Sequence, residues 1–124
     1  MRVSDASTTY FDALTAGDAA RLLTTIVEGD HFLKIGTDAG EVVSGSTSAP
    51  EYYQDHVSST ENFSIDTHRL DIEERSETAW FFTDQTWHVT WKGTPEVLAM
   101  RITGVLERQE STWKFAQIHA SLGV

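Results

Sequence analysis

Histidine is the side chain most often used for acid–base catalysis and metal binding, and the histidines of this chain are scattered. No two of them lie four residues apart on a predicted helix, and closely spaced carboxylates flank none of the five: His31, His56, His68, His88 and His119. Metal sites need such convergence, so no metal ion is expected. The chain has no cysteine, which excludes disulfides, thiolate catalysis and cysteine-bound zinc. No nucleotide or nucleophile motif is present, and no cofactor is expected.

Arg101, Gln117 and His119 form a second candidate group. If neither strand is bulged, they share one side of two adjacent predicted strands with the aromatic residues Trp113 and Phe115. Polar groups in such surroundings must be hydrogen-bonded when they are buried. One interpretation is an anion site in which the guanidinium of Arg101 binds a carboxylate. The alternative, which the sequence favours, is a polar patch that orients two subunits in a dimer interface.

Three predicted helices precede these strands. The first begins at Ser4 or Asp5 and ends at Gly17, and its buried face is formed by apolar residues at helical spacing, Val3, Ala6, Tyr10 and Leu14. Asp18 caps a second helix, expected to run to residue 27, and a short strand is expected at residues 31–35. A capping box at residues 48–51 predicts the start of the third helix.

From Phe63 onward the apolar residues alternate with a period of two. This pattern predicts strands at about residues 63–75, 77–91, 96–108 and 112–121. Helices followed by an antiparallel meander indicate an α+β fold. Within the first of these strands, Phe63 and Ile65 lie on one phase, but Leu70 and Ile72 lie on the other. This switch predicts a β-bulge that bends the sheet.

The next two strands are apolar on both faces. Phe81 and Trp87 lie on one phase, whereas Trp80 and Phe82 lie on the other. Helices on one side leave the second face of an antiparallel sheet open to water, so an apolar second face needs its own cover. In a chain this short, we expect that cover to be a second copy. The sequence therefore predicts a homodimer, with Trp87 and Trp113 placed at its interface.

Length and composition limit the function classes. The 124 residues predict a single domain, residues 1–124, with one core. Nineteen acidic and nine basic residues give a formal net charge of −10, which disfavours nucleic acid and anionic membranes as partners. No apolar run is long enough to cross a bilayer, and the first residues contain no apolar signal segment. A cytoplasmic location is expected.

Three segments together resemble the nuclear transport factor 2 superfamily, and within it the SnoaL-like proteins. These segments are residues 10–18, residues 35–41 with Gly45, and the closing stretch 113–121 with Arg101 and Thr103. The last is similar to the closing hairpin of SnoaL-like proteins and of calcium/calmodulin-dependent kinase association domains. The resemblance implies a cone-shaped α+β fold, with three helices packed on a curved antiparallel or mixed sheet.

The ketosteroid isomerase of this superfamily implies further roles. Its first helix resembles residues 10–18, which places Tyr10 at the position of the oxyanion-donor tyrosine. An ordinary core tyrosine with a satisfied hydroxyl is the alternative. The isomerase base corresponds to Lys34, and its second acidic donor falls near Thr103 or Gly104. Since neither role is filled by a carboxyl group, steroid isomerisation is not expected.

The resemblance also implies a pocket between the helices and the sheet. Its expected lining is Tyr10, Leu14, Lys34, Tyr53, Trp80, Phe82, Ile102, Gly104, Ala116 and Ile118. Lys34 at its mouth, near Asp38 and Glu41, suits a small apolar or weakly acidic ligand. The function expected is small-molecule binding, with isomerase, lyase or cyclase activity as its enzymatic form. A non-catalytic ligand-binding or association module is the alternative.

Overall fold

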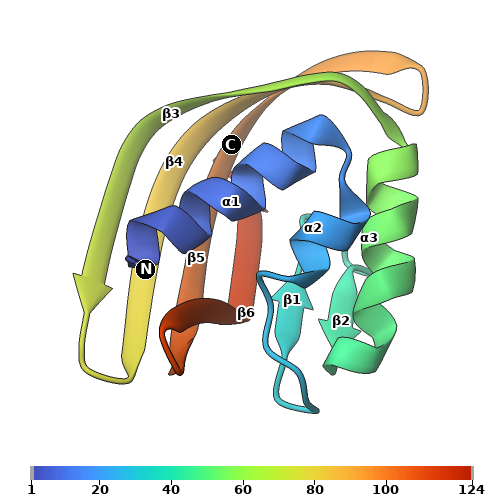
Figure 1. The fold of residues 1–124 in the computed structure, drawn as a ribbon. Coiled ribbons are helices and arrows are strands. Elements are labelled where there is room, and N and C mark those ends of the chain that lie inside the picture. Colours follow the sequence, from blue (N-terminus) through green and yellow to red (C-terminus); the bar gives the residue numbers. More distant parts are fainter. Residues whose placement is uncertain (1, 124) are drawn as a thin grey trace.

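A computed structural model describes residues 2–123, which form one six-stranded sheet and three α-helices (Figure 1). The strands are β1 Leu33–Ile35, β2 Val42–Ser44, β3 Thr60–Glu74, β4 Thr78–Trp91, β5 Thr94–Gln109 and β6 Thr112–Leu122. Their order across the sheet is β2-β1-β6-β5-β4-β3. The sheet is mixed because β1 runs parallel to β6, whereas the other neighbours are antiparallel. The predicted α+β fold is confirmed, and the short strand β2 is an addition to it.

The first two helices are separated by a two-residue turn. Helix α1, Val3–Ala16, ends at Gly17, whose φ of 70° lies in the left-handed region that glycine adopts without strain. The Asp18 carboxylate then accepts a hydrogen bond from the backbone N–H of Arg21 and caps α2, Ala19–Leu23. Helix α2 is shorter than expected because the chain turns into the sheet: the Val27 N–H donates to the Phe115 carbonyl in β6. The predicted stop and cap at residues 17 and 18 are correct.

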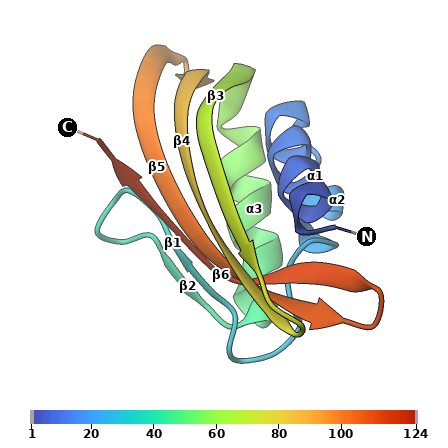
Figure 2. The same cartoon turned by 90° about the vertical axis from the view of Figure 1, so that its left-hand side faces the viewer.

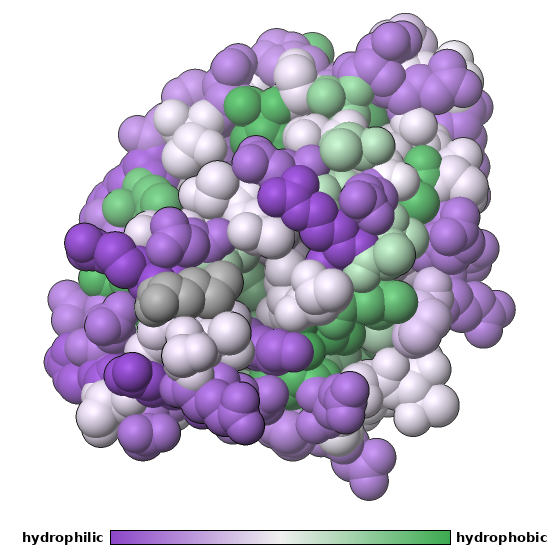
Figure 3. All heavy atoms as spheres, viewed as in Figure 1, coloured by the Kyte–Doolittle hydropathy of each residue, from purple (hydrophilic) through white to green (hydrophobic). Residues whose placement is uncertain are grey.

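The third helix, α3, runs over Ala49–Ser58 and follows a short 3₁₀ turn, Ser46–Ser48. The predicted capping box at its start is not formed, because the preceding turn holds Ser48 in a helical conformation and its side chain makes no capping hydrogen bond. All three helices lie on the same side of the sheet (Figure 2). Seen from the helix side, the surface is mainly hydrophilic, with small apolar areas (Figure 3). The core therefore lies between the helices and one face of the sheet, called here the inner face.

Two strands contain irregularities that decide which side chains face the core. The register of β3 against β4 shifts between Thr67 and Arg69, which confirms the predicted bulge. A second bulge lies in β6, where Gln117 pairs with Val105 but Phe115 pairs with Leu106, so Ala116 is the extra residue. As a result, the inner face receives Trp113 and Phe115 before the bulge but Ile118 and Ala120 after it.

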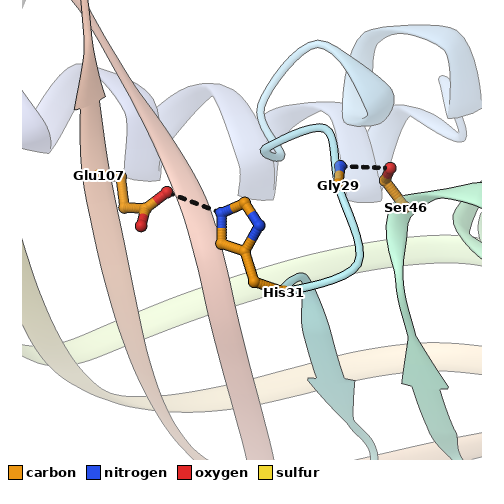
Figure 4. Close-up of polar contacts among 4 residues, drawn as sticks. All are labelled: Gly29, His31, Ser46 and Glu107. Carbon is orange, nitrogen blue, oxygen red and sulfur yellow. Dashed lines mark hydrogen bonds and ion pairs between the residues drawn. The ribbon is translucent and has the colours of Figure 1, made fainter.

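The segment leading into β1 is fastened at two points (Figure 4). The His31 ring points toward the Glu107 carboxylate of β5, with 2.9 Å between Nε2 and Oε1. On the other side, the Gly29 N–H donates to Ser46 Oγ over 2.8 Å. The strand itself starts at Leu33, not at His31 as expected from the sequence. These contacts hold β1 beside β6, in the register that pairs Lys34 with Ile118.

None of the helices within residues 2–123 combines the length and the apolarity that a membrane span requires.

Candidate functional site

A cavity lies between the helices and the inner face of the sheet, and it has two adjoining parts that share lining residues. The outer part, called here the mouth, has a volume of about 260 Å³, and the inner chamber measures about 20 Å³. Both parts are lined by Lys34, Tyr52, His56, Trp87 and Ala120. The inner chamber has room for one water molecule. The mouth approaches the lower end of the volumes typical of small-molecule sites.

Lys34 is the only lysine or arginine side chain that lines this cavity within residues 2–123. It extends from β1 toward the inner face and is only 8 % exposed. Its Nζ lies 5.4 Å from the centroid of the Tyr52 ring, and no carboxylate oxygen of the described chain lies within 4.0 Å of it. Burial disfavours the ammonium and lowers the pKa of Lys34 to about 8, although the charge of Glu41 acts in the opposite direction.

Glu41 and Tyr52 form a hydrogen-bonded pair at the rim of the mouth. The Tyr52 hydroxyl donates to Oε2 of Glu41 over 3.2 Å. Burial is the main cause that raises the pKa of Tyr52 above its usual range, so this phenol stays protonated and remains a donor. Gly36 makes room for the pair, because a Cβ at that position would collide with the Glu41 carboxylate.

His56 extends from α3 into the wall between the two parts of the cavity. Its Nδ1 is buried and has no hydrogen-bond partner in the described chain. Burial, assisted by the nearby charge of Lys34, lowers the pKa of His56 to about 4, so the imidazole is neutral at pH 7. The ring packs edge-on against Trp91, with 5.3 Å between the centroids. An unpaired buried polar atom in a cavity wall is costly unless a ligand or water satisfies it.

Tyr10 and Tyr53 meet at the inner chamber. Their hydroxyl oxygens are 2.8 Å apart, and the side chains are 3 % and 0 % exposed. Burial raises the pKa of both phenols, which keeps them neutral. In such a pair one O–H is used internally, whereas the other remains available to a group in the chamber. Tyr10 is therefore a satisfied core tyrosine that still presents its hydroxyl pair to the cavity.

The structure brings together six of the ten residues predicted to line the pocket. These six line the inner chamber: Tyr10, Leu14, Lys34, Tyr53, Ile102 and Ile118. Gly104 is buried but packs against the Phe81 ring, and Ala116 is the bulge residue of β6. Neither lines the cavity.

Trp80 and Phe82 were predicted in the pocket, and the structure places them on the opposite, outer face of the sheet. Trp80 is 45 % exposed, because the residues of β4 that face the helices are Ala79, Phe81 and their odd-numbered successors. Trp87 belongs to this inner series and lines the cavity, where its indole N–H donates to Gln85 Oε1 over 2.8 Å. Trp87 therefore does not lie on the outer face, where the sequence predicts the dimer interface.

The group predicted around Arg101 is divided by the bulge at Ala116. Arg101, Gln117 and His119 lie exposed on the outer face, whereas Trp113 is buried in the core at 3 % exposure. The condition that neither strand be bulged is not met, and for this reason Trp113 does not share a face with them. Within residues 2–123, no three histidine or carboxylate side chains converge as metal ligands would.

Sequence reasoning missed much of the cavity lining, including the aromatic residues Tyr52, His56 and Trp91. A usable signal was present for the first two, because residues four apart in a helix share one face. Their own face of α3 is polar and aromatic, whereas Tyr53 and Val57 on the adjacent face are buried in the core. Neither hydropathy nor spacing showed that the first face would turn toward Lys34.

A cone of three helices on a curved, open mixed sheet, with a cavity between the layers, defines the nuclear transport factor 2-like class of proteins. The family model of the SnoaL-like domain matches residues 3–124, and the chain belongs to this family. No curated protein matches the chain.

Solved structures with the same fold come from several organisms. A proposed dehydratase of the NTF2-like family from Streptomyces avermitilis has 18 % identity and a TM-score of 0.88, covering 98 % of this chain and 94 % of its own. A proposed calcium/calmodulin-dependent kinase II association domain from Thiobacillus denitrificans has 15 % identity and a TM-score of 0.82, with coverage of 97 % and 94 %. A ketosteroid isomerase-like protein from Erwinia carotovora atroseptica has 15 % identity and a TM-score of 0.81, with coverage of 98 % and 94 %. At these identities the likeness shows the fold.

Proposed function

We propose that this protein binds a small, mostly apolar molecule through one hydrogen-bond-accepting end and acts on it by acid–base chemistry, as an isomerase or lyase would. The observation that carries the proposal is the Lys34 side chain, which is buried in the cavity wall without a carboxylate within 4.0 Å. A desolvated cation of this kind is costly to the fold. A ligand carrying a carbonyl, phenol or carboxylate supplies an oxygen that can accept a hydrogen bond from the Lys34 ammonium.

The walls of the cavity suit the rest of such a molecule. Trp87, Leu98 and Met100 line the mouth, and Ile102 and Ile118 line the chamber. Apolar walls with a few convergent polar groups are the usual composition of a small-molecule site. The size of the mouth favours a ligand of one or two rings.

Acid–base groups around the same cavity favour an enzyme over a purely structural module. The Glu41–Tyr52 pair is hydrogen-bonded, and the neutral His56 ring lies in the wall beside Lys34. Groups whose pKa values are displaced in a cleft are typical of functional sites. Because the resemblance to ketosteroid isomerase places Lys34 near the position of the isomerase carboxylate, turnover of ketosteroids is not expected.

A thermal-shift screen tests the binding step. Naphthoate, naphthol and naphthylmethylamine share one ring system but differ in the polar end. At a hundredfold excess over the dissociation constant, a ligand stabilises the folded state by about 2.7 kcal/mol. The acid and the phenol should stabilise the wild type, and this gain should be lost in Lys34→Met but retained in Lys114→Met, the control on β6. Equal stabilisation by the amine, or an unchanged gain in Lys34→Met, would contradict the proposal.

A second candidate function, association through the sheet, is favoured by the outer face. Large apolar side chains lie there with little cover: Trp80 is 45 % exposed, Val97 69 % and Val105 37 %. We propose that a second copy of the chain covers this face, with Arg101, Gln117 and His119 as its polar part. Dimerisation and ligand binding use opposite faces of the sheet and are compatible with each other.

A further inference from the structure

We propose that Lys34 is a nucleophilic lysine that forms an imine with an aldehyde or ketone bound in the cavity. This inference rests on the proposed function, since it concerns a ligand held at the same site. It narrows the ligand class from any hydrogen-bond acceptor to a carbonyl compound. It also gives the protein a covalent step.

The position of Lys34 makes such a reaction geometrically accessible. The side chain lines both the mouth and the inner chamber, so a molecule that enters through the mouth meets it before reaching the closed end. The strand pairing of Lys34 with Ile118 fixes the backbone, and the Tyr52 ring lies against the ammonium with 5.4 Å between Nζ and the ring centroid. The Lys34 amine is therefore held at the cavity wall and does not extend freely into solvent.

The surroundings of Lys34 also increase the fraction of the neutral amine, which is the reactive form. A lysine paired with a carboxylate is held as ammonium, and Lys34 has no such partner within 4.0 Å. Its pKa of about 8 means that roughly a tenth of the molecules carry the free amine at pH 7. Desolvation in an apolar pocket is one of the established ways to activate a lysine.

The reaction balances without an oxidant or reductant. Nζ loses a proton to water, and its lone pair attacks the carbonyl carbon while the π pair of the C=O bond moves to oxygen. Transfer of a proton from nitrogen to that oxygen gives a neutral carbinolamine. A second proton, returned by water, lets this oxygen leave as water, while the nitrogen lone pair forms the C=N bond. The protonated imine that results keeps a positive charge in place of the ammonium.

Titratable groups from several elements line the cavity together with Lys34. They are Asp38 and Glu41 from the loop after β1, Tyr52, Tyr53 and His56 from α3, Glu96 from β5 and Tyr10 from α1. Among them, the neutral His56 ring is the one whose Nδ1 lacks a hydrogen-bond partner in the described chain. This Nδ1 can accept a hydrogen bond from the carbinolamine hydroxyl, while water carries the transferred protons.

The chain has three lysines, and Lys92 and Lys114 lie outside the cavity lining. These two lysines therefore serve as internal controls for the reactivity of Lys34. The experiment incubates the wild-type protein with naphthaldehyde and cyanoborohydride at pH 7, then measures the alkylation rate of each lysine by peptide mass mapping. We expect Lys34 to be alkylated at least about tenfold faster than Lys92 and Lys114. The rate at Lys34 should level off above pH 8. Alkylation of all three lysines at similar rates would overturn the inference.

Naphthoate separates this inference from the proposed function, because it binds the same cavity but cannot form an imine. Naphthoate should slow the alkylation of Lys34 and leave Lys92 and Lys114 unaffected. If naphthoate stabilises the protein through Lys34 but naphthaldehyde shows no preference for that residue, the imine is excluded and the binding function stands. If neither compound interacts with the cavity, the proposed function fails and the inference fails with it.

Discussion

The hydroxyl oxygens of Tyr10 and Tyr53 lie 2.8 Å apart and join helix α1 to helix α3 across the inner end of the cavity. The two residues are 43 positions apart in the sequence, and neither is more than 3 % exposed. Their rings also pack edge to face, with 6.0 Å between the centroids. The pair therefore combines a structural role with the position of a cavity group.

A double-mutant cycle should reveal the coupling between these tyrosines. Tyr10→Phe or Tyr53→Phe leaves the other buried hydroxyl without its partner and should lower the free energy of unfolding by ~1–2 kcal/mol. The double variant removes both hydroxyls and should cost clearly less than the sum of the single changes. Urea denaturation measures all four proteins. Additive losses would show that the hydrogen bond contributes nothing of its own.

Removal of the Lys34 charge should stabilise the fold. The unfolded chain holds this proton up to a pKa of 10.5, but the folded chain releases it at about 8. Wild-type stability is therefore reduced below pH 8 and recovers as the pH rises toward 10.5. Lys34→Met should gain up to ~3 kcal/mol at pH 7, and this gain should shrink between pH 8 and 10. Lys114→Met is the control, and a constant difference across this range would contradict the assignment.

His56 should contribute to acid sensitivity. Its pKa is about 4 in the folded chain and 6.5 when unfolded, so the unfolded state binds more protons between these values. Stability should fall by up to ~3 kcal/mol as the pH drops from 6.5 to 4. Carboxylates titrate in the same window, so the measurement is the difference between wild type and His56→Phe. That difference should change with pH across this window, and a difference that stays constant would contradict the assignment.

A charge on the outer face should prevent self-association. Trp80→Glu or Val105→Glu places a carboxylate where the proposed second copy would bury apolar area, and either variant should be monomeric by light scattering at micromolar concentration. Thr8→Glu, on the exposed side of α1, is the control and should not change the mass. Monomeric wild-type protein under the same conditions would show that the outer face is not covered by a second copy.

The order of elements could be predicted because local signals marked it. Gly17 with Asp18 separated the first two helices, and the phase change between Ile65 and Leu70 located the bulge of β3. These features depend on backbone conformation and alternation, which neighbouring residues alone determine.

The inner and outer faces of the sheet could not be assigned in the same way. Strand β4 is aromatic on both phases, so alternation gave no reason to prefer Phe81 and Trp87 over Trp80 and Phe82. In β6 the adjacent apolar residues Phe115 and Ala116 fit either phase, which concealed the bulge at Ala116. The cavity was predicted only in part for this reason. Its polar side, with Tyr52 and His56, depends on how α3 sits against β1, a tertiary contact that the sequence does not specify locally.

The bulge at Ala116 gives strand β6 two opposite parities. Before it, odd-numbered positions face the helices, and after it, even-numbered positions do. Without this single residue, Phe115, Gln117 and Ile118 would alternate regularly between the two faces, so the bulge alone causes the change of parity. A scan of all substitutions along the strand should therefore show tolerance alternating with intolerance, and the alternation should reverse once, at position 116. Variation accepted on the exterior would leave the chamber untouched, so the binding site and the association surface could diverge independently along one strand.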